Sequence, residues 1–375
     1  MVSTLSSMKR TSGSTSGFQT SSSPSFRNLI INGDMSIAQR GTSIAMAAAS
    51  NGGTLDQYEW IGTGACAVTI TQDSDVPTMA QAGSQFKYSL KVDCTTADAS
   101  IAAGDRAILR HHIEGYNMAH LGWGASGALA ATLSFWVKSP KTGVHTVGFL
   151  NGPANRSFAS EYTVSSANTW EKKTITVPEG DTTGSWDYTN GRGLVIVFTL
   201  MAGTTFDMTA DTWAGGIGEH STSNQVNCMD NTANNFYLTG VQFEVGSSAT
   251  DFEHVPYDHQ LRRCQRYFRR IGEGVAYTSI ASGYSVSTVE AFCPYTFPVE
   301  MRAAPTLAIS AATDFRLLHA GGAVITCSAL VINVASPQSC RLRPAVASGL
   351  TANMPCTLSG INSVTNALDF IAELI

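Results

Sequence analysis

Four aspartates lie in loops rich in Gly, Thr and Ser, where acidic side chains could act on a sugar. They are Asp181, Asp187, Asp207 and Asp211. Two carboxylates held about 5 to 9.5 Å apart can hydrolyse a glycosidic bond, and a sequence does not give that distance. Acids in such loops more often form turns or bind calcium. The sequence therefore leaves a glycan depolymerase as an alternative and assigns no catalytic residue.

Aromatic residues in two of these loops are better candidates for binding. Trp186 and Tyr188 lie in the run GSWDYTNG at 184–191, and Trp213 precedes Ala-Gly-Gly. Sugars stack their apolar faces on such rings, while nearby Asp and Asn form hydrogen bonds. Trp186, Tyr188 and Trp213 are therefore the candidate glycan-binding residues. The alternative is that each ring caps the fold or packs on a neighbouring subunit.

Motifs of nucleotide, hydrolase and metal sites are absent from the sequence. It contains no GxSxG, P-loop, GxGxxG or HExxH pattern. His111 and His112 are adjacent in a strand-like run, so they should face opposite sides of a sheet and each make an ordinary polar contact. The eight cysteines form no CxxC or other close pair, which argues against a zinc site. We predict no metal and no cofactor.

Composition favours β-structure with large buried cores. Hydrophobic residues make up 43% of the 375 residues, charged residues only 14%, and the net charge is −5. A chain of this length usually forms more than one compact domain. The acidic balance argues against nucleic acid as a partner. Because no 18 apolar residues run together, we expect no membrane insertion.

Repeated strand-like runs separated by turn residues occupy 28–257. Alternation of polar and apolar residues is clearest in SFWVK at 134–138 and KTITV at 173–177. Eight or nine antiparallel strands predict an all-β jelly-roll sandwich. The expected strands are 67–71, 85–92, 107–114, 128–137, 146–150, 161–164, 172–177, 194–200 and 235–243.

A basic, aromatic segment follows this region and predicts a linking helix at 258–271. Asp258 could cap it, and Leu261, Cys264, Tyr267 and Phe268 would form one apolar stripe. Its five arginines could bind phosphates. We expect them instead to pair with carboxylates of the same or neighbouring chains. The candidate interdomain or oligomer-contact residues are Leu261, Arg262, Arg266, Tyr267 and Phe268.

Residues 272–375 predict a second, smaller β-domain. They hold four arginines, no lysine and six acids, and are rich in Ala and Ser. We expect such a region to bury little by itself and to gain burial between identical subunits. The expected strands are 295–299, 306–310, 315–319, 324–334, 341–346 and 368–374.

Five segments carry a resemblance to bacteriophage tail-fibre and minor virion proteins. They are NLIINGDMSIAQRG at 28–41, TLSFWVKS at 132–139, TGVQFE at 239–244, CQRYF at 264–268 and MRAAPT at 301–306. The opening and closing strands of 28–257 also resemble carbohydrate-binding-module jelly rolls, in which the first and last strands pair. The resemblance implies a role in the virion more firmly than it implies a named ligand. The fibre resemblance also implies a trimer.

The first 27 residues predict an extended, Ser-rich segment that anchors the chain to a virion. They hold ten Ser and four Thr but no acid, a composition that does not fold by itself. The candidate anchoring residues are Phe18, Phe26 and Arg27. We expect them to lie along a portal, tail or capsid protein. The alternative is a tail that folds back on its own domain.

Together these features predict a non-enzymatic virion protein assembled in the host cytoplasm. It would display its β-domains for attachment to a host-surface glycan. A capsid or tail decoration protein without receptor binding is the main alternative. Because the cytoplasm is reducing, the cysteines should be free, buried thiols.

Overall fold

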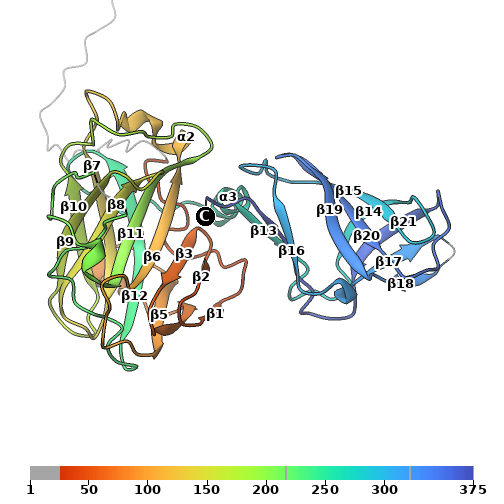
Figure 1. Cartoon of the computed structure of the whole chain (residues 1–375), viewed down its shortest axis with the longest axis horizontal. Coiled ribbons are helices and arrows are strands. Elements are labelled where there is room, and N and C mark those ends of the chain that lie inside the picture. The colour runs from red at the N-terminus through yellow and green to blue at the C-terminus, as the bar shows by residue number, and fades with distance from the viewer. Residues whose placement is uncertain (1–25, 216–217, 321, 375) are drawn as a thin grey trace, which may run out of the picture.

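The computed structural model describes residues 26–215, 218–320 and 322–374. Two β-rich lobes lie side by side and are joined through a short helix and strand, α3 and β13 (Figure 1). Phe18 and the rest of the predicted anchor before Phe26 lie outside the described residues. The anchoring role of that segment therefore stays a prediction.

The first lobe is a jelly-roll sandwich of two six-stranded sheets, and all its strand pairs are antiparallel. One sheet has the order β1 (Ser43–Met46), β4 (Ala67–Asp73), β5 (Ser89–Thr96), β12 (Asn235–Val245), β7 (Ala131–Lys138) and β10 (Glu171–Val177). The other has the order β2 (Asn51–Gly53), β3 (Tyr58–Gly62), β6 (Arg106–Glu114), β11 (Arg192–Ala202), β8 (Gly143–Asn151) and β9 (Ser157–Val164).

All nine strands predicted for this lobe are present, although several limits differ. The sandwich also contains β1, β2 and β3, which the sequence pattern did not indicate. β1 and β2 are three or four residues long and contain a single fully buried residue, Met46, so they lack the alternation that marks a half-buried strand. β3 is buried along its whole length and lacks alternation for the opposite reason.

The beginning and end of the sandwich lie together, as the jelly-roll resemblance implied. The backbone N–H of Leu29 donates to the carbonyl of Phe243 at 2.9 Å, and that of Val241 donates to the carbonyl of Gly33 at 2.9 Å. A bulge in β12 between Thr239 and Gln242 makes this possible, because it releases Val241 from the ladder. The segment at 28–33 is therefore held beside β12 without forming a regular strand.

The second lobe contains a three-stranded sheet and a seven-stranded sheet. The small sheet has the order β13 (Phe268–Ile271), β22 (Leu368–Ile371), β16 (Thr306–Ile309). The large one has the order β18 (Val324–Thr326), β17 (Phe315–His319), β21 (Pro355–Gly360), β14 (Ser279–Ser285), β15 (Ala291–Thr296), β20 (Ser339–Ala345), β19 (Ala329–Ala335). The run predicted as one strand at 324–334 is two strands, and β13, β14 and β21 were not predicted.

The prediction that the second lobe buries little by itself is wrong. Phe297, Phe315, Leu342 and Phe370 belong to one core of buried side chains between its sheets. Low charge in this region therefore reflects an ordinary apolar core. It is no argument that the lobe needs neighbouring subunits.

The predicted linking helix is shorter than expected. Helix α3 spans Tyr257–Gln265, begins after Pro256 and has no side-chain cap from Asp258. The remainder of the predicted helix is β13, whose residues pair with β22 from Phe268 opposite Ile371 to Ile271 opposite Leu368. Pairing with a distant strand has overridden the helical pattern.

Short helices complete the described part of the chain, and none of its helices is long and apolar enough to cross a membrane. The α-helical turns are α1 (Met79–Ala82) and α2 (Gly115–Met118), and the 3₁₀ turns are η1 (Ala119–Leu121), η2 (Thr204–Phe206) and η3 (Ala312–Asp314).

All eight cysteines are free and buried, which confirms the prediction. Burial raises the pKa of the Cys66 thiol to about 11, and that of Cys228 to about 12. These thiols are therefore uncharged at neutral pH and behave as small apolar side chains.

A buried carboxylate joins the two lobes. Glu114, at the end of β6, accepts hydrogen bonds from Nε and Nη2 of Arg266 at 2.8 and 2.6 Å and from the Tyr267 hydroxyl at 2.5 Å. The Glu114 side chain is 1% exposed. Hydrogen bonding to Glu114 raises the pKa of Arg266, while burial is the main cause of the raised pKa of Tyr267.

We predict that Glu114→Gln lowers the free energy of unfolding by about 2 kcal/mol, because Arg266 loses its ionic partner inside the junction. Arg262→Ala is the control, because Arg262 lies on the adjoining helix α3 and is exposed. That change should stay within about 0.5 kcal/mol. Urea denaturation of both variants measures the difference. Equal stability of Glu114→Gln and the wild type would contradict this role.

The buried histidines of the core should make the folded protein less stable in mild acid. Burial is the main cause that lowers the pKa of His145 to about 4, whereas the unfolded chain binds its proton near pH 6.5. Above pH 6.5 neutral His145 does not oppose folding. As the pH falls from 6.5 toward 4, the unfolded chain binds a proton at this histidine that the folded chain does not bind, so stability is lost. From pH 7 to 5.5 this costs about 1 kcal/mol.

Urea denaturation at pH 7 and 5.5 of the wild type and His145→Gln isolates this contribution. The variant should lose about 1 kcal/mol less than the wild type over this interval. An identical pH dependence of the two proteins would show that His145 is not neutral in the fold.

Candidate functional site

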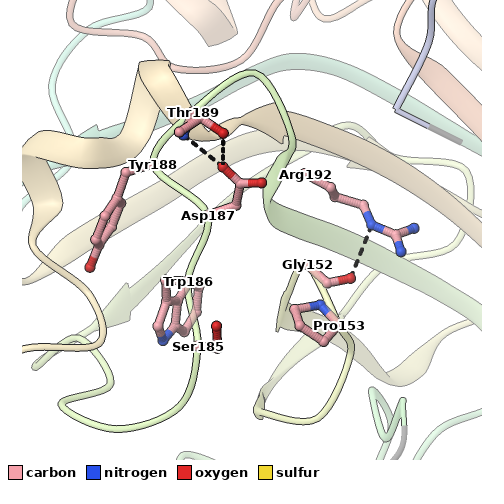
Figure 2. Close-up of a pocket in the computed structure, with 8 residues that line it drawn as sticks. All are labelled: Gly152, Pro153, Ser185, Trp186, Asp187, Tyr188, Thr189 and Arg192. Atoms are coloured by element: carbon pink, nitrogen blue, oxygen red, sulfur yellow. Dashed lines mark hydrogen bonds between the residues drawn. The ribbon is translucent and has the colours of Figure 1, made fainter.

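An open pocket of about 640 Å³ lies at one end of the sandwich, between two of its loops. One loop follows β8 and contributes Gly152 and Pro153, and the other precedes β11 and contributes residues 185–189. Arg192 completes the lining. Figure 2 shows the rings of Trp186 and Tyr188 on one side of this pocket and Arg192 with Pro153 on the other. The structure therefore brings two of the three predicted glycan-binding residues to one pocket.

Close backbone contacts hold the second loop in place. The N–H groups of Gly115 and Tyr116 donate to the carbonyls of Gly191 and Thr189 at 2.9 and 2.8 Å. A side chain at Gly115 would begin 2.4 Å from the carbonyl oxygen of Asp187, so only glycine permits this approach. The turn is further fixed by Asp187, whose Oδ1 accepts from the N–H and the hydroxyl of Thr189 at 2.6 and 2.7 Å (Figure 2).

Trp186 and Trp213 pack into a tryptophan cluster beneath the pocket. The ring centroid of Trp123 lies 5.3 Å from that of Trp186 and 5.4 Å from that of Trp213, both edge to face. Trp186 is 8% exposed, and its indole N–H donates to the Thr183 carbonyl at 3.0 Å. Trp213 is half-buried and donates to the Glu179 carbonyl at 3.0 Å. These two rings close the end of the core, which is the alternative interpretation of the loop tryptophans.

Tyr188 is the aromatic ring of the pocket that remains available to a ligand. It is 39% exposed, and its hydroxyl donates to the Trp123 carbonyl. That bond fixes the ring at the pocket wall (Figure 2). Across the pocket, Arg192 donates from Nε to the Gly152 carbonyl at 3.1 Å. Tyr188, Asp187 and Arg192 thus supply a stacking face, an acceptor and a donor.

The structure does not gather the four loop aspartates around one pocket. Among the described residues that line the pocket, Asp187 is the single carboxylate. Asp181 is buried away from it and accepts two hydrogen bonds from Arg156, at 2.6 and 3.0 Å. Burial alone would raise the pKa of Asp181, but hydrogen bonds from Arg156 and Thr183 hold it below its ordinary value. The backbone of Asp207 forms an isolated β-bridge with that of Ser221, and Asp211 is exposed in the loop that follows.

The two adjacent histidines point to opposite faces of β6, as predicted. His111 faces the core, where its Nε2 lies 3.1 Å from the Ile31 carbonyl oxygen. Burial lowers its pKa to about 3. His112 lies on the opposite face of the sheet, where it is also buried, and its Nε2 lies 2.9 Å from Oε2 of Glu59. Both make the ordinary polar contacts that the sequence suggested.

The residues predicted for an interdomain contact do lie at the junction between the lobes. Leu261 packs beside a cluster formed by Ile31, Ile37, Cys264, Tyr267 and Leu374. Phe268 is buried with the Arg40 guanidinium 3.6 Å from its ring centroid. Arg262 is exposed. Whether this helix also contacts other copies stays a prediction.

The arginines of the helix segment mostly make contacts within the chain. Arg266 pairs with Glu114, and Arg270 pairs with Asp369 through two bonds of 2.7 Å. Arg263 and Arg269 instead donate to the Asn28 carbonyl and the Tyr295 hydroxyl. The expected pairing with carboxylates is thus confirmed for two of the five arginines.

The two predicted anchoring residues that the structure describes contact their own lobe. The backbone N–H of Phe26 donates to Glu253 at 2.5 Å, and the residue is 58% exposed. Arg27 donates to Thr250 at 2.8 Å and lies 3.5 Å from Glu244. Arg27 therefore fixes the entry of the chain into the sandwich, and Phe26 remains open to a partner.

Sequence reasoning missed Trp123 and Arg192. Trp123 lies between two glycines in LGWGASG and follows no strand, so no periodicity marked it as a core residue. Arg192 begins β11 and is separated from Tyr188 by three residues. The basic residue close to a loop tyrosine was the available signal for it.

Comparison with known proteins gives no assignment from sequence. No family model matches the chain, and no curated protein matches it in a sequence search.

Solved structures give distant similarities to part of this chain. The enzymatically active domain of tailspike protein 4 from bacteriophage CBA120 is 14% identical, with a TM-score of 0.30 over 59% of this chain and 22% of that chain. A family 4 carbohydrate-binding module is 13% identical, with a TM-score of 0.30 over 58% of this chain and 99% of the module. A family 11 carbohydrate-binding module of a Clostridium thermocellum cellulase is 12% identical, with a TM-score of 0.28 over 52% of this chain and 92% of the module. Similarities this distant assign no ligand to this protein.

We predict that Trp186→Ala lowers the free energy of unfolding by about 3 to 5 kcal/mol, because it opens a cavity in the tryptophan cluster. Tyr188→Ala removes a ring that is 39% exposed and should cost about 1 kcal/mol, mainly from the lost hydrogen bond to Trp123. Chemical denaturation of both variants gives the comparison. A small effect of Trp186→Ala would mean that its ring is free to serve a ligand.

Proposed function

We propose that this protein is a structural component of a bacteriophage virion, of the tail-fibre or spike type, that attaches to a host-surface glycan through the open pocket of its sandwich. The virion part of the proposal is supported by the five sequence segments that resemble phage fibre and minor virion proteins. In this proposal residues 1–27 attach the chain to other virion proteins. The copies form a homo-oligomer, a trimer as the resemblance implies.

The observation that carries the glycan part is the exposed ring of Tyr188 in a pocket of about 640 Å³. Its phenol is fixed by the bond to Trp123, so stacking a sugar on it would order few additional groups. The turn uses Oδ1 of Asp187 and not its Oδ2. Arg192 lies on the other side of the pocket. A fixed ring with polar groups around it is a common arrangement for binding the apolar face and hydroxyls of a sugar.

The same geometry favours binding without hydrolysis. A glycosidase needs a second carboxylate across the bond to be cleaved. Asp187 is the one carboxylate among the described residues of the pocket, and its Oδ1 is occupied by the turn. We therefore propose a binding protein and not a depolymerase.

The test is binding of the purified protein to capsular polysaccharide and lipopolysaccharide isolated from cells that the phage infects. We predict that Tyr188→Ala weakens binding about tenfold, through loss of the stacking ring. Tyr116→Ala is the matched control, because Tyr116 is 61% exposed on α2 and does not line the pocket. It should bind like the wild type.

Binding by Tyr188→Ala as tight as that of the wild type would remove the pocket from the proposal. Failure of the folded wild type to bind any of these polysaccharides would contradict glycan attachment and favour the decoration alternative. Release of reducing sugar ends during the assay would contradict the non-enzymatic part.

A further inference from the structure

A second pocket, of about 310 Å³, lies on the outer face of the sheet that contains β6, β11 and β8. Arg106, Ile108 and Arg110 alternate along β6, so their side chains share this face, while Ala107 and Leu109 between them face the core. Opposite them on β11, Val197 pairs with Arg110. The register therefore places two arginines beside an apolar floor.

A wall of stacked rings closes one side of this pocket. The backbone of His220 lies directly on β8, because a side chain at Gly148 would begin 2.9 Å from the Cα of His220. The ring of His220 stacks on that of Phe206, with centroids 5.0 Å apart, and the Arg106 guanidinium lies 4.9 Å from the Phe206 centroid. These contacts hold Arg106 at the rim without using its hydrogen-bond donors.

Positive charge exceeds negative charge in the pocket. Arg106, Arg110 and Arg192 all line it, and among the described residues the carboxylate paired with them is Glu59, 3.2 Å from Nε of Arg110. Glu59 also contacts His112 at 2.9 Å. Partial burial of both guanidinium groups lowers the pKa of Arg106 and of Arg110.

Two buried nitrogen atoms in the pocket have no partner within the described part of the chain. They are Nε of Arg106 and Nε2 of His220, whose residue is 1% exposed. The Nδ1 of His220 is already engaged by Thr199 at 3.1 Å. Buried polar atoms are normally satisfied, so the unpaired Nε–H of Arg106 is suited to a ligand that supplies an acceptor.

We propose that this pocket binds an acidic sugar residue such as a uronic acid, with its carboxylate between Arg106 and Arg110 and its apolar ring face on Val195 and Val197. A planar carboxylate matches the paired donors of a guanidinium group. Volumes from about 300 Å³ upward are typical of small-ligand pockets. The apolar floor favours a sugar acid over a bare inorganic anion, which would leave that floor uncovered.

This inference rests on the proposed glycan attachment and specifies its chemistry. Gly152 and Arg192 line both pockets, so the two sites are contiguous along the sheet. A saccharide bound across them would place one ring against Tyr188 and its acidic residue against Arg106. The protein would then select glycans that carry a negative charge at a fixed distance from the residue stacked on Tyr188.

Isothermal titration with methyl β-glucuronide and methyl β-glucoside tests the proposal, because these probes differ only in the charged carboxylate. We expect the glucuronide to bind at least about tenfold more tightly than the glucoside, and Arg106→Gln to remove that preference. Arg106→Lys should restore part of it. Lys172→Gln removes an exposed charge from the other sheet and should leave glucuronide binding unchanged.

Three results would overturn the inference. Equal binding of both probes would show that the charge is not read, and equal binding by the wild type and Arg106→Gln would place the site elsewhere. Inorganic phosphate that binds as tightly as the glucuronide would show a simple anion site. If polysaccharide binding that depends on Tyr188 persists in any of these cases, the proposed function survives and only this inference fails.

Discussion

The buried carboxylate of Glu114 is the interaction on which the arrangement of the two lobes depends. It lies at the end of a sandwich strand and accepts hydrogen bonds from Arg266 and Tyr267, which lead directly into the first strand of the second lobe. A carboxylate removed from water needs such partners, because its charge is costly to bury alone. The direction in which the chain leaves α3 is therefore fixed by a residue more than 150 positions earlier in the sequence.

The end of the chain reinforces the same junction. Leu374 packs with Tyr267 and Cys264, and Glu373 pairs with Arg40 of the sandwich at 2.6 Å. Arg302 of the second lobe donates to the carbonyls of Ala372 and Asn190 at 2.6 and 3.0 Å. Segments near the beginning, middle and end of the described chain thus meet at one place (Figure 1). The lobes are held by several directional contacts and not by a flexible linker.

Local pattern was enough to predict the all-β architecture but not the pairing of distant segments. Strands such as β10 and β17 alternate cleanly, and their limits were found within one residue. The strand β13 looked helical because its apolar spacing continued that of α3, and only β22, about 100 residues later, gives it a strand partner. The short strands β1 and β2 carry too few buried side chains to show a period.

The candidate site was predicted in part for the same reason. A loop rich in turn residues correctly drew attention to 184–191, but whether each ring faces a ligand or the core depends on what lies beneath it. Trp123 lies there, contacts Trp186 and Trp213, and makes them part of the core. The loop could be found from sequence, whereas the choice of Tyr188 over Trp186 required the packing.

The junction and the outer face of the sandwich differ in how their buried charges are paired. With charged residues at only 14% of the chain, most buried ones have a matched partner, as Glu114 has in Arg266 and Asp181 has in Arg156. The two arginines on the outer face of β6 are an exception. Among the described residues around them, Glu59 is the one carboxylate near both Arg106 and Arg110. Since desolvated cations destabilise a fold unless compensated, this excess of positive charge is consistent with the ligand site that we propose on this face.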